Sequence, residues 1–423
     1  MKPSIQPVKG TRDYYPEEMA ARNFLYQTAR KVAESFGYQE WDAPFLETIE
    51  LYAAKSGEEL VNKQSFVFAD RGGDMVTLRP ELTPSLARLV SQRQKQLVYP
   101  VRWWSWGPFW RYERPQKGRT REFFQWNVDL IGVDTPEADA EMVAIAASFL
   151  REAGLSSDQV NILVNNRKLI AAEMAALEIP VGLRKDAFRL IDRCDKLSAK
   201  DWDDYAAEMG LLAPQIEGLN AILTDGDLWR KSPELTACFR LIDSLGLKNY
   251  VRFAPQIVRG LDYYTGTVFE AWDRDGEFRA ILGGGRYDNL VSDVGGEPLP
   301  AVGFAMGDLV ISLVLKKFNA FPADLGASPA KVLVTLFDPA YLEISFQVAG
   351  RLRQAGIPTA IYPEVARLAK QFKYGDRMGM RLALVIGPDE AQKNAVTVKD
   401  LKTAEQRLVP QVELVQTVSQ LIE

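Results

Sequence analysis

The chain has 423 residues, of which 47% are hydrophobic and 25% are charged. This length is too great for one hydrophobic core, so two or three domains are expected. No apolar run approaches the roughly 20 residues that span a bilayer. The N-terminus has no apolar stretch of the signal-peptide kind. We therefore expect a cytoplasmic protein without a membrane partner. The sequence contains no histidine, which excludes catalysis by an imidazole. The two cysteines, Cys194 and Cys238, are far apart in the sequence and cannot form a zinc ligand set without histidines. No metal centre is therefore expected.

The first third of the chain predicts a mixture of helices and strands. Residues 17–36 predict an amphipathic helix, because their apolar side chains recur on one face. Residues 38–46 predict a strand that Pro44 interrupts, as at an edge or a bulge. Two further strands are predicted at residues 97–110 and 123–131, and a long amphipathic helix at residues 137–153.

Residues 166–247 show helical periods and no strand pattern, which indicates an inserted helical domain. Strand patterns then return, and the last of them continues into a helix. The predicted strands are residues 251–253, 267–272 and 278–282, and the strand followed by a helix is residues 300–315.

Residues 318–329 have the composition of a linker, and the pattern changes beyond them. Three short apolar runs, at residues 332–337, 359–362 and 382–386, alternate with helical stretches. This βαβαβ order predicts a small α/β domain with a parallel sheet. The chain is thus expected to form two domains, residues 1–325 and 330–423.

The segment from Val258 to Glu270 carries the most chemical information. It places Arg259 close to the phenol hydroxyls of Tyr263 and Tyr264, followed by a turn and a strand. An arginine remains charged, and a phenol both donates and accepts hydrogen bonds. The segment therefore suits a site that holds a phosphate and a polar ring together.

A second informative stretch lies on the predicted hairpin between residues 110 and 123. It holds four arginines, Arg111, Arg114, Arg119 and Arg121. Such a cluster has to face either solvent or anions, since burying unpaired charges is costly. A solvated basic loop is one interpretation, and an anion site is the other; the presence of the Arg259 segment elsewhere in the chain favours the anion site.

Together these stretches resemble the histidyl-tRNA synthetase family of class II aminoacyl-tRNA synthetases. The resemblance extends from Lys9–Asp13 to the last helix and includes Arg79–Thr83 (RPELT), Leu282–Asp288 (LGGGRYD) and Ala301–Val310. It implies an α+β catalytic domain, an antiparallel sheet flanked by helices with the insertion at about 166–247, and a C-terminal α/β anticodon-binding domain. It also implies a homodimer that ligates L-histidine to tRNA(His) through histidyl-adenylate, with ATP as substrate and Mg²⁺ accompanying it.

The resemblance assigns residues to the nucleotide and to the tRNA. Arg111 and Arg259 would act catalytically from opposite sides of the α-phosphate, and Glu113 would contact the adenine side. Arg119 or Arg121 would reach the outer phosphates. Arg114 and Gln116 would meet the acceptor end of the tRNA.

The resemblance also assigns a histidine site. Glu81, Thr83 and Gln125 would bind the α-amino group, which needs a carboxylate and further acceptors once it is desolvated. Asp129 and Tyr264 would share the imidazole, and Tyr263 and Tyr287 would line the pocket. One departure concerns the third class II motif, where the usual Glu-Arg is replaced by Leu309-Val310, so that a cation is missing. Either another arginine replaces it, or the adenine and the γ-phosphate are held differently.

In residues 330–423, 12 lysines and arginines face 10 acidic residues, although the whole chain carries −5. Arg367, Lys370, Lys373, Arg377 and Arg381 recur at helical spacing, which predicts a basic face. A solvated face is one interpretation and a tRNA phosphate track is the other. The resemblance favours the track and assigns Arg367, Lys370 and Lys373 to tRNA.

Two rival functions remain at this point: a histidine-sensing regulatory paralogue and a non-catalytic tRNA-binding module. The retained Arg259 segment and the C-terminal domain favour the ligase over both. The missing histidines have two explanations, compositional drift or an advantage to an enzyme whose own synthesis needs no histidine.

Overall fold

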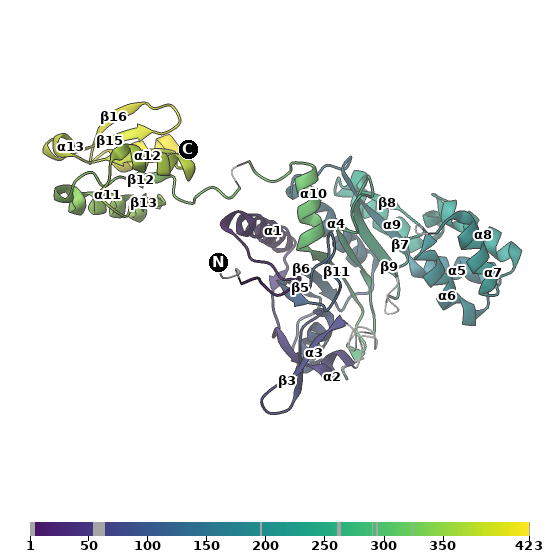
Figure 1. Cartoon of the computed structure of the whole chain (residues 1–423). Coiled ribbons are helices and arrows are strands. Elements are labelled where there is room, and N and C mark those ends of the chain that lie inside the picture. Colours follow the sequence, from purple (N-terminus) through teal and green to yellow (C-terminus); the bar gives the residue numbers. More distant parts are fainter. Residues whose placement is uncertain are drawn as a thin grey trace. The chain divides into compact units, whose positions relative to one another are not determined.

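The computed structural model describes residues 5–53, 64–194, 197–259, 264–289, 291–292, 295–323 and 325–422. These residues divide into two compact units, one holding nearly all residues up to Pro322 and the other comprising Ala323–Glu423 and a short N-terminal segment. Each unit has its own sheet and its own buried core (Figure 1). No helix among the described residues is long and apolar enough to cross a lipid bilayer.

An eight-stranded sheet forms the centre of the first unit, in the order β1-β5-β6-β11-β10-β9-β7-β8. Its inner pairs are antiparallel, as the sequence predicted, whereas the two edge pairs β1–β5 and β7–β8 are parallel. The strands are β1 (Gln39–Glu40), β5 (Val101–Trp110), β6 (Glu122–Ile131), β7 (Val160–Asn166), β8 (Val251–Phe253), β9 (Thr267–Asp273), β10 (Leu282–Arg286) and β11 (Ala301–Gly307).

Three predicted helices, α1 (Pro16–Ser35), α4 (Pro136–Glu152) and α10 (Asp308–Lys317), contribute to one large core with the sheet (Figure 1). The core is aromatic, and Trp126 lies 5.0 Å from Phe149 of α4 between ring centroids. Helix α4 begins sharply because the Thr135 hydroxyl accepts from the Ala138 amide and a proline follows.

A smaller sheet in the order β2-β4-β3 lies beside the large one in the same unit. The single strand predicted over residues 38–46 is wrong, because the chain divides there between β1 and β2. Arg79, which is fully buried, bonds Asp42 Oδ1 at 2.6 Å and the Ala43 carbonyl at 3.0 Å, and so fixes the segment between the two strands. The elements are β2 (Leu46–Thr48), α2 (Ile49–Ala53), β3 (Phe66–Ala69), β4 (Met75–Leu78) and α3 (Thr83–Arg93).

The helical insertion is confirmed, since the described residues between β7 and β8 form helices and no strand. Helices α5–α8 extend beyond the sheet edge, whereas α9 packs beside α4 (Figure 1). The helices are α5 (Arg167–Ala176), α6 (Val181–Ile191), α7 (Ala199–Glu208), α8 (Ala213–Thr224) and α9 (Pro233–Ser244), with short 3-10 turns at Leu228–Lys231 and Lys248–Tyr250.

The strand predicted over residues 278–282 is also wrong, because the strand begins only at Leu282 and includes the three glycines. Residues before it form a turn. The buried Asp273 carboxylate accepts hydrogen bonds from the Glu277 and Phe278 amides at 3.0 and 3.1 Å, which holds this turn closed.

The C-terminal unit has a five-stranded sheet in the order β13-β12-β14-β15-β16. The three predicted strands pair in parallel, but β15 and β16 were missed and run antiparallel, so the sheet is mixed. The strands are β12 (Val332–Val334), β13 (Thr359–Ile361), β14 (Leu382–Val385), β15 (Ala395–Asp400) and β16 (Gln406–Pro410), and the helices are α11 (Leu342–Gln354), α12 (Leu368–Arg377), α13 (Pro388–Gln392) and α14 (Leu414–Ile422).

The basic row is only partly helical. Helix α12 contains Lys370, Lys373 and Arg377, while Arg367 is its N-terminal cap residue. Arg381 lies beyond the helix and forms an ion pair with Asp400 at 2.6 Å. The prediction of five basic residues on one helix face is therefore wrong at both ends, because the helix is shorter than the spacing suggested.

Candidate active site

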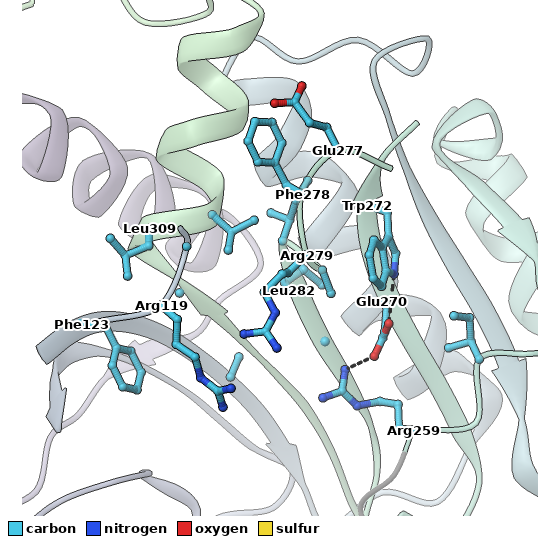
Figure 2. A pocket seen from close by; sticks show the side chains of 18 of the residues that line it. Arg119, Phe123, Arg259, Glu270, Trp272, Glu277, Phe278, Arg279, Leu282 and Leu309 are labelled. Carbon is cyan, nitrogen blue, oxygen red and sulfur yellow. Dashed lines mark hydrogen bonds and ion pairs between the residues drawn. The ribbon is translucent and has the colours of Figure 1, made fainter. Parts of the chain in front are cut away.

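A cavity of about 760 Å³ lies in the first unit, above the centre of the eight-stranded sheet (Figure 2). The hairpin between β5 and β6 forms one wall, and β9, β10 and the turn between them form another. The start of α10 and the end of α6 complete it. The residues that matter for its charge are Arg111, Glu113, Arg119, Asp192, Arg259, Glu270, Glu277 and Arg279.

Arg111 is positioned by the hairpin and by the RPE segment. Its amide donates to the Arg121 carbonyl at 2.8 Å, which closes the hairpin, and its Nε donates to the Pro80 carbonyl at 2.9 Å. The guanidinium carbon lies 5.3 Å from the ring centre of Phe123, which also lines the cavity. Two segments distant in sequence thus fix one cation beside an aromatic ring.

Arg259 lies at the opposite wall. Its Nη1 contacts Glu270 Oε1 at 2.7 Å, and Trp272 Nε1 donates to the other oxygen of Glu270 at 3.0 Å (Figure 2). The backbone of Arg259 has a positive φ of 52°, which is unfavourable for a residue with a side chain. Arg167, the first residue of α5, holds this conformation by donating to the Arg259 carbonyl at 2.9 Å.

Gly283 on β10 makes room for Arg259. It pairs with Glu270 across the sheet, and a Cβ atom at this position would overlap the Arg259 guanidinium. Gly283 therefore leaves room for the Arg259 guanidinium against strand β10.

Arg119 and Arg121 differ in orientation. Arg119 lines the cavity and forms an ion pair with Glu113. Arg121 does not line the cavity; its Nε donates to the Glu113 carbonyl at 3.2 Å, and its guanidinium lies 4.3 Å from the Tyr112 ring centre. Of the two arginines that the sequence offered for the outer phosphates, Arg119 lines the cavity and Arg121 does not, and their contact with phosphate stays a prediction.

A second polar group lies deeper in the sheet. Asp129 on β6 is 8% exposed, and its carboxylate accepts a hydrogen bond from the hydroxyl of Tyr287. Burial raises the pKa of Asp129 to about 7, and the Tyr287 hydrogen bond offsets part of the rise. The paired residue on β11, Gly303, leaves room for this carboxylate because glycine has no Cβ atom. A Cβ atom at this position would overlap the carboxylate. Such a group exchanges a proton near neutral pH.

The third motif, Ala301–Val310, contacts a residue near the N-terminus of the chain. Asp308, the first residue of α10, accepts from Arg12 at 2.8 Å and from the Phe124 amide at 2.9 Å. This contact sets the start of α10 against β6 and places Leu309 and Val310 at the cavity. The apolar side chains of Leu309 and Val310 thus line the cavity wall where the sequence resemblance led us to expect an arginine.

Comparison with known proteins identifies the family. A model of the histidyl-tRNA synthetase family matches residues 10–308, and an anticodon binding domain model matches residues 331–421. The histidine–tRNA ligases of Thermoplasma volcanium and Opitutus terrae are 39% and 37% identical, each match covering 96% of this chain and 96% of the relative. The chain belongs to the histidyl-tRNA synthetase family. The crystal structure of the histidyl-tRNA synthetase from Nostoc sp. has a TM-score of 0.87 at 25% identity, covering 99% of this chain and 100% of that one.

The histidyl-tRNA synthetase assignment separates the predicted residues into two groups. Arg111, Glu113, Arg119 and Arg259, expected at the nucleotide, all line the cavity. Of the described residues expected at histidine, none lines it. Asp129 and Tyr287 meet each other, and Tyr264 lies with its ring centre 5.6 Å from the Arg259 guanidinium carbon. The expected sharing of an imidazole by Asp129 and Tyr264 stays a prediction.

The remaining predicted residues are placed less decisively. Thr83 begins α3, the Glu81 carbonyl accepts from Tyr52, and Gln125 lies on β6 between Gly107 and Gly307. Tyr263 lies outside the described residues. On the hairpin loop, Arg114 and Gln116 are exposed.

Several residues at the cavity were missed from the sequence. Glu270 and Trp272 alternate on β9 and so share one face, which a period-two pattern could have indicated. Asp192 comes from the helical insertion and Arg279 from the turn before β10, and no local pattern marks either.

Proposed function

We propose that this chain joins L-histidine to tRNA(His) in two steps. The histidine carboxylate attacks the α-phosphate of ATP, giving histidyl-adenylate and pyrophosphate. A ribose hydroxyl of the terminal adenosine of the tRNA then takes the histidyl group and releases AMP. The observation that carries this proposal is the gathering of Arg111, Arg119 and Arg259 around one cavity, in a chain of this family.

The first step needs no protein nucleophile, so a chain without histidine can perform it. It needs in-line positioning and cations where negative charge develops. Arg111 and Arg259, on opposite walls, supply that charge at the α-phosphate. Phe123 and Glu113 hold the adenine side, and Arg119 faces the outer phosphates.

Histidine would bind deeper, against the sheet. Glu81, Thr83 and Gln125 receive its ammonium group, and Asp129 with its tyrosine neighbours receives the imidazole. A site of this kind leaves buried polar groups unpaired when an analogue lacks the ring nitrogens, and such sites discriminate by roughly 10⁴–10⁵.

Magnesium would enter as part of the substrate. Among the described residues no group of three histidine, cysteine or carboxylate side chains could hold a metal. Three of the cavity carboxylates, Glu113, Glu270 and Glu277, face Arg119, Arg259 and Lys317 respectively. The phosphate oxygens of ATP are thus better ligands here than the protein, and hard oxygen ligands suit Mg²⁺.

The two domains would divide the work, with residues 1–325 catalytic and residues 330–423 reading the anticodon. Arg114 and Gln116 would contact the acceptor end, and Arg367, Lys370 and Lys373 would contact anticodon-stem phosphates. The enzyme would act in the cytoplasm.

We further propose a homodimer. The small three-stranded sheet exposes an apolar surface that a second copy could cover, as closed twofold symmetry requires. Of its partly exposed apolar side chains, Leu46 and Phe68 lie on one face and Val67 and Met75 on the other, and Phe45 precedes β2. Sedimentation velocity should give twice the monomer mass, and Phe68→Glu with Met75→Glu should give the monomer.

The regulatory and non-catalytic alternatives have little support. The similar relatives are named as ligases, the anticodon binding domain is present, and the cavity retains its arginines. The decisive experiment is ATP–pyrophosphate exchange with each of the twenty amino acids in turn. Exchange should depend on histidine alone, and stimulation by a different amino acid would reject the proposal.

A further inference from the structure

Arg279 is a cavity cation without a carboxylate partner among the residues that the structure describes. Arg119 and Arg259 each face a carboxylate, and the Nε of Arg111 bonds a backbone carbonyl. The guanidinium of Arg279, in contrast, makes no ion pair or hydrogen bond with any residue in the described part of the chain. Figure 2 shows it pointing into the same space as the guanidinium groups of Arg119 and Arg259.

The turn that carries Arg279 is held at both ends. Before it, Asp273 accepts from two backbone amides, and Lys317 of α10 forms ion pairs with Asp273, Asp275 and Glu277 at 3.3, 2.7 and 3.3 Å. After it, the Ile281 amide donates to the Ala271 carbonyl at 2.7 Å. The side chain of Arg279 is exposed, but the backbone that carries it is fixed at both ends. This fixed backbone lowers the entropy cost of binding a ligand.

Its surroundings favour an anion with several charges. Burial, together with the positive charges of Arg279 and Arg111, lowers the pKa of the Arg119 guanidinium. Three like charges gathered around one cavity repel one another, and a polyanion bound between them would relieve this repulsion. The same cavity is lined by the apolar Leu309 and Val310, where the sequence resemblance led us to expect an arginine.

We propose that Arg279 binds the outer phosphates of ATP and replaces the missing arginine of the third motif. This inference rests on the proposed function and names one more binding residue for that reaction. A charge-assisted hydrogen bond to phosphate contributes about 1.5–3 kcal/mol. Its loss should therefore weaken ATP binding by about 10- to 10²-fold.

The test compares Arg279→Ala, Arg279→Met and Arg279→Lys with the wild-type enzyme, using direct binding of ATP and of AMP together with histidine-dependent ATP–pyrophosphate exchange. The alanine and methionine variants should lose about 10- to 10²-fold in ATP affinity and less than about 2-fold in AMP affinity. The lysine variant, which keeps the charge, should lie between them and the wild type. The KM for histidine should not change.

Arg274→Ala is the matched control, since Arg274 is exposed in the same β9–β10 connection and does not line the cavity; it should bind ATP normally. Equal weakening of ATP and AMP would place Arg279 at the adenosine and overturn the proposal, as would unchanged ATP affinity. A wild-type enzyme without histidine-dependent exchange would instead refute the proposed function, which keeps the two failures distinct.

Discussion

At the scale of single residues, Arg259 shows how much structure supports one cation. Its left-handed backbone, the Arg167 hydrogen bond, the Glu270 contact and the open surface of Gly283 all hold one side chain at the cavity wall. A conformation of this kind persists only where its surroundings fix it. We therefore regard Arg259 as preorganised for charge that develops during the reaction.

Arg259→Ala should lower the rate of histidine activation by about 10²–10³, the effect of losing one donor to the transition state. Single-turnover formation of histidyl-adenylate measures this rate directly. Arg252→Ala, an exposed arginine on the neighbouring strand β8, serves as control and should leave the rate unchanged. Near-normal adenylate formation by the Arg259 variant would remove it from the catalytic step.

Asp129 gives a prediction about pH. Its pKa in the folded protein is about 7, raised by burial from an ordinary value of 3.8, so the folded state retains a proton that the unfolded state has lost. Where the folded state binds more protons, stability falls as pH rises. The contribution of Asp129 to stability is therefore greatest below about pH 4, declines up to about pH 7 and is constant above it.

Asp129→Asn removes this titration. Between pH 5 and pH 8 the wild-type protein, without histidine, should lose about 2–3 kcal/mol of unfolding free energy relative to the variant, at about 1.4 kcal/mol per pKa unit. Urea unfolding followed by tryptophan fluorescence at the two pH values measures the difference. Parallel pH profiles for the two proteins would show that Asp129 is ionised throughout.

At the scale of elements, the sequence predicted the long regular pieces well. The helix at residues 137–153 has an apolar period over several turns and a Thr-Pro start, and the structure has it at Pro136–Glu152. The two strands of the basic hairpin are confirmed as well, although the first begins at Val101 and not at residue 97. Long periodic patterns constrain the local structure strongly, because many apolar residues lie on the same buried face.

Elements fixed by distant contacts escaped prediction. Residues 278–281 look like a strand, but the Asp273 carboxylate holds their backbone in a turn. Strand β16 is exposed at all but one of its residues, so its sequence lacks an apolar alternation. Arg279 and Asp192 reach the cavity only through tertiary packing, which no local spacing encodes.

One residue of the GGGRYD motif proves to hold elements together. Arg286 is 2% exposed and bonds Asp139 of α4 at 2.6 Å, with Val133 and Thr135 carbonyls as further partners. Asp139 also accepts from Thr267 of β9 at 2.6 Å. The network thus joins two strands of the sheet to the helix behind it.

Arg286→Met should destabilise the first unit by about 3–5 kcal/mol, because it leaves the buried Asp139 carboxylate without its cation. Adding Asp139→Asn should recover part of the loss, so that the double variant is more stable than the sum of the single effects predicts. Urea midpoints of the four proteins give the coupling energy. Simple additivity would show that the two side chains act independently.

At the scale of the whole molecule, the two compact units have separate sheets and cores. Every described residue of the cavity belongs to the first unit, whereas Arg367, Lys370 and Lys373 belong to the second. Amino acid activation and tRNA binding should therefore be separable. A chain ending at residue 325 should keep histidine-dependent ATP–pyrophosphate exchange within about 3-fold, a change of less than 1 kcal/mol.

The same truncated chain should lose at least about 10²-fold in kcat/KM for tRNA(His), equivalent to about 2.7 kcal/mol of lost anticodon contacts. In the full-length enzyme, Lys370→Ala with Lys373→Ala should leave exchange unchanged and weaken tRNA binding. If both lysines contact phosphates, the plot of log affinity against log salt should become shallower by about 1.4–1.8, since each phosphate contact contributes about 0.7–0.9. An unaltered salt slope for the lysine variant would mean that α12 presents a solvated face. Full aminoacylation by the truncated chain would mean that the first unit alone recognises the tRNA.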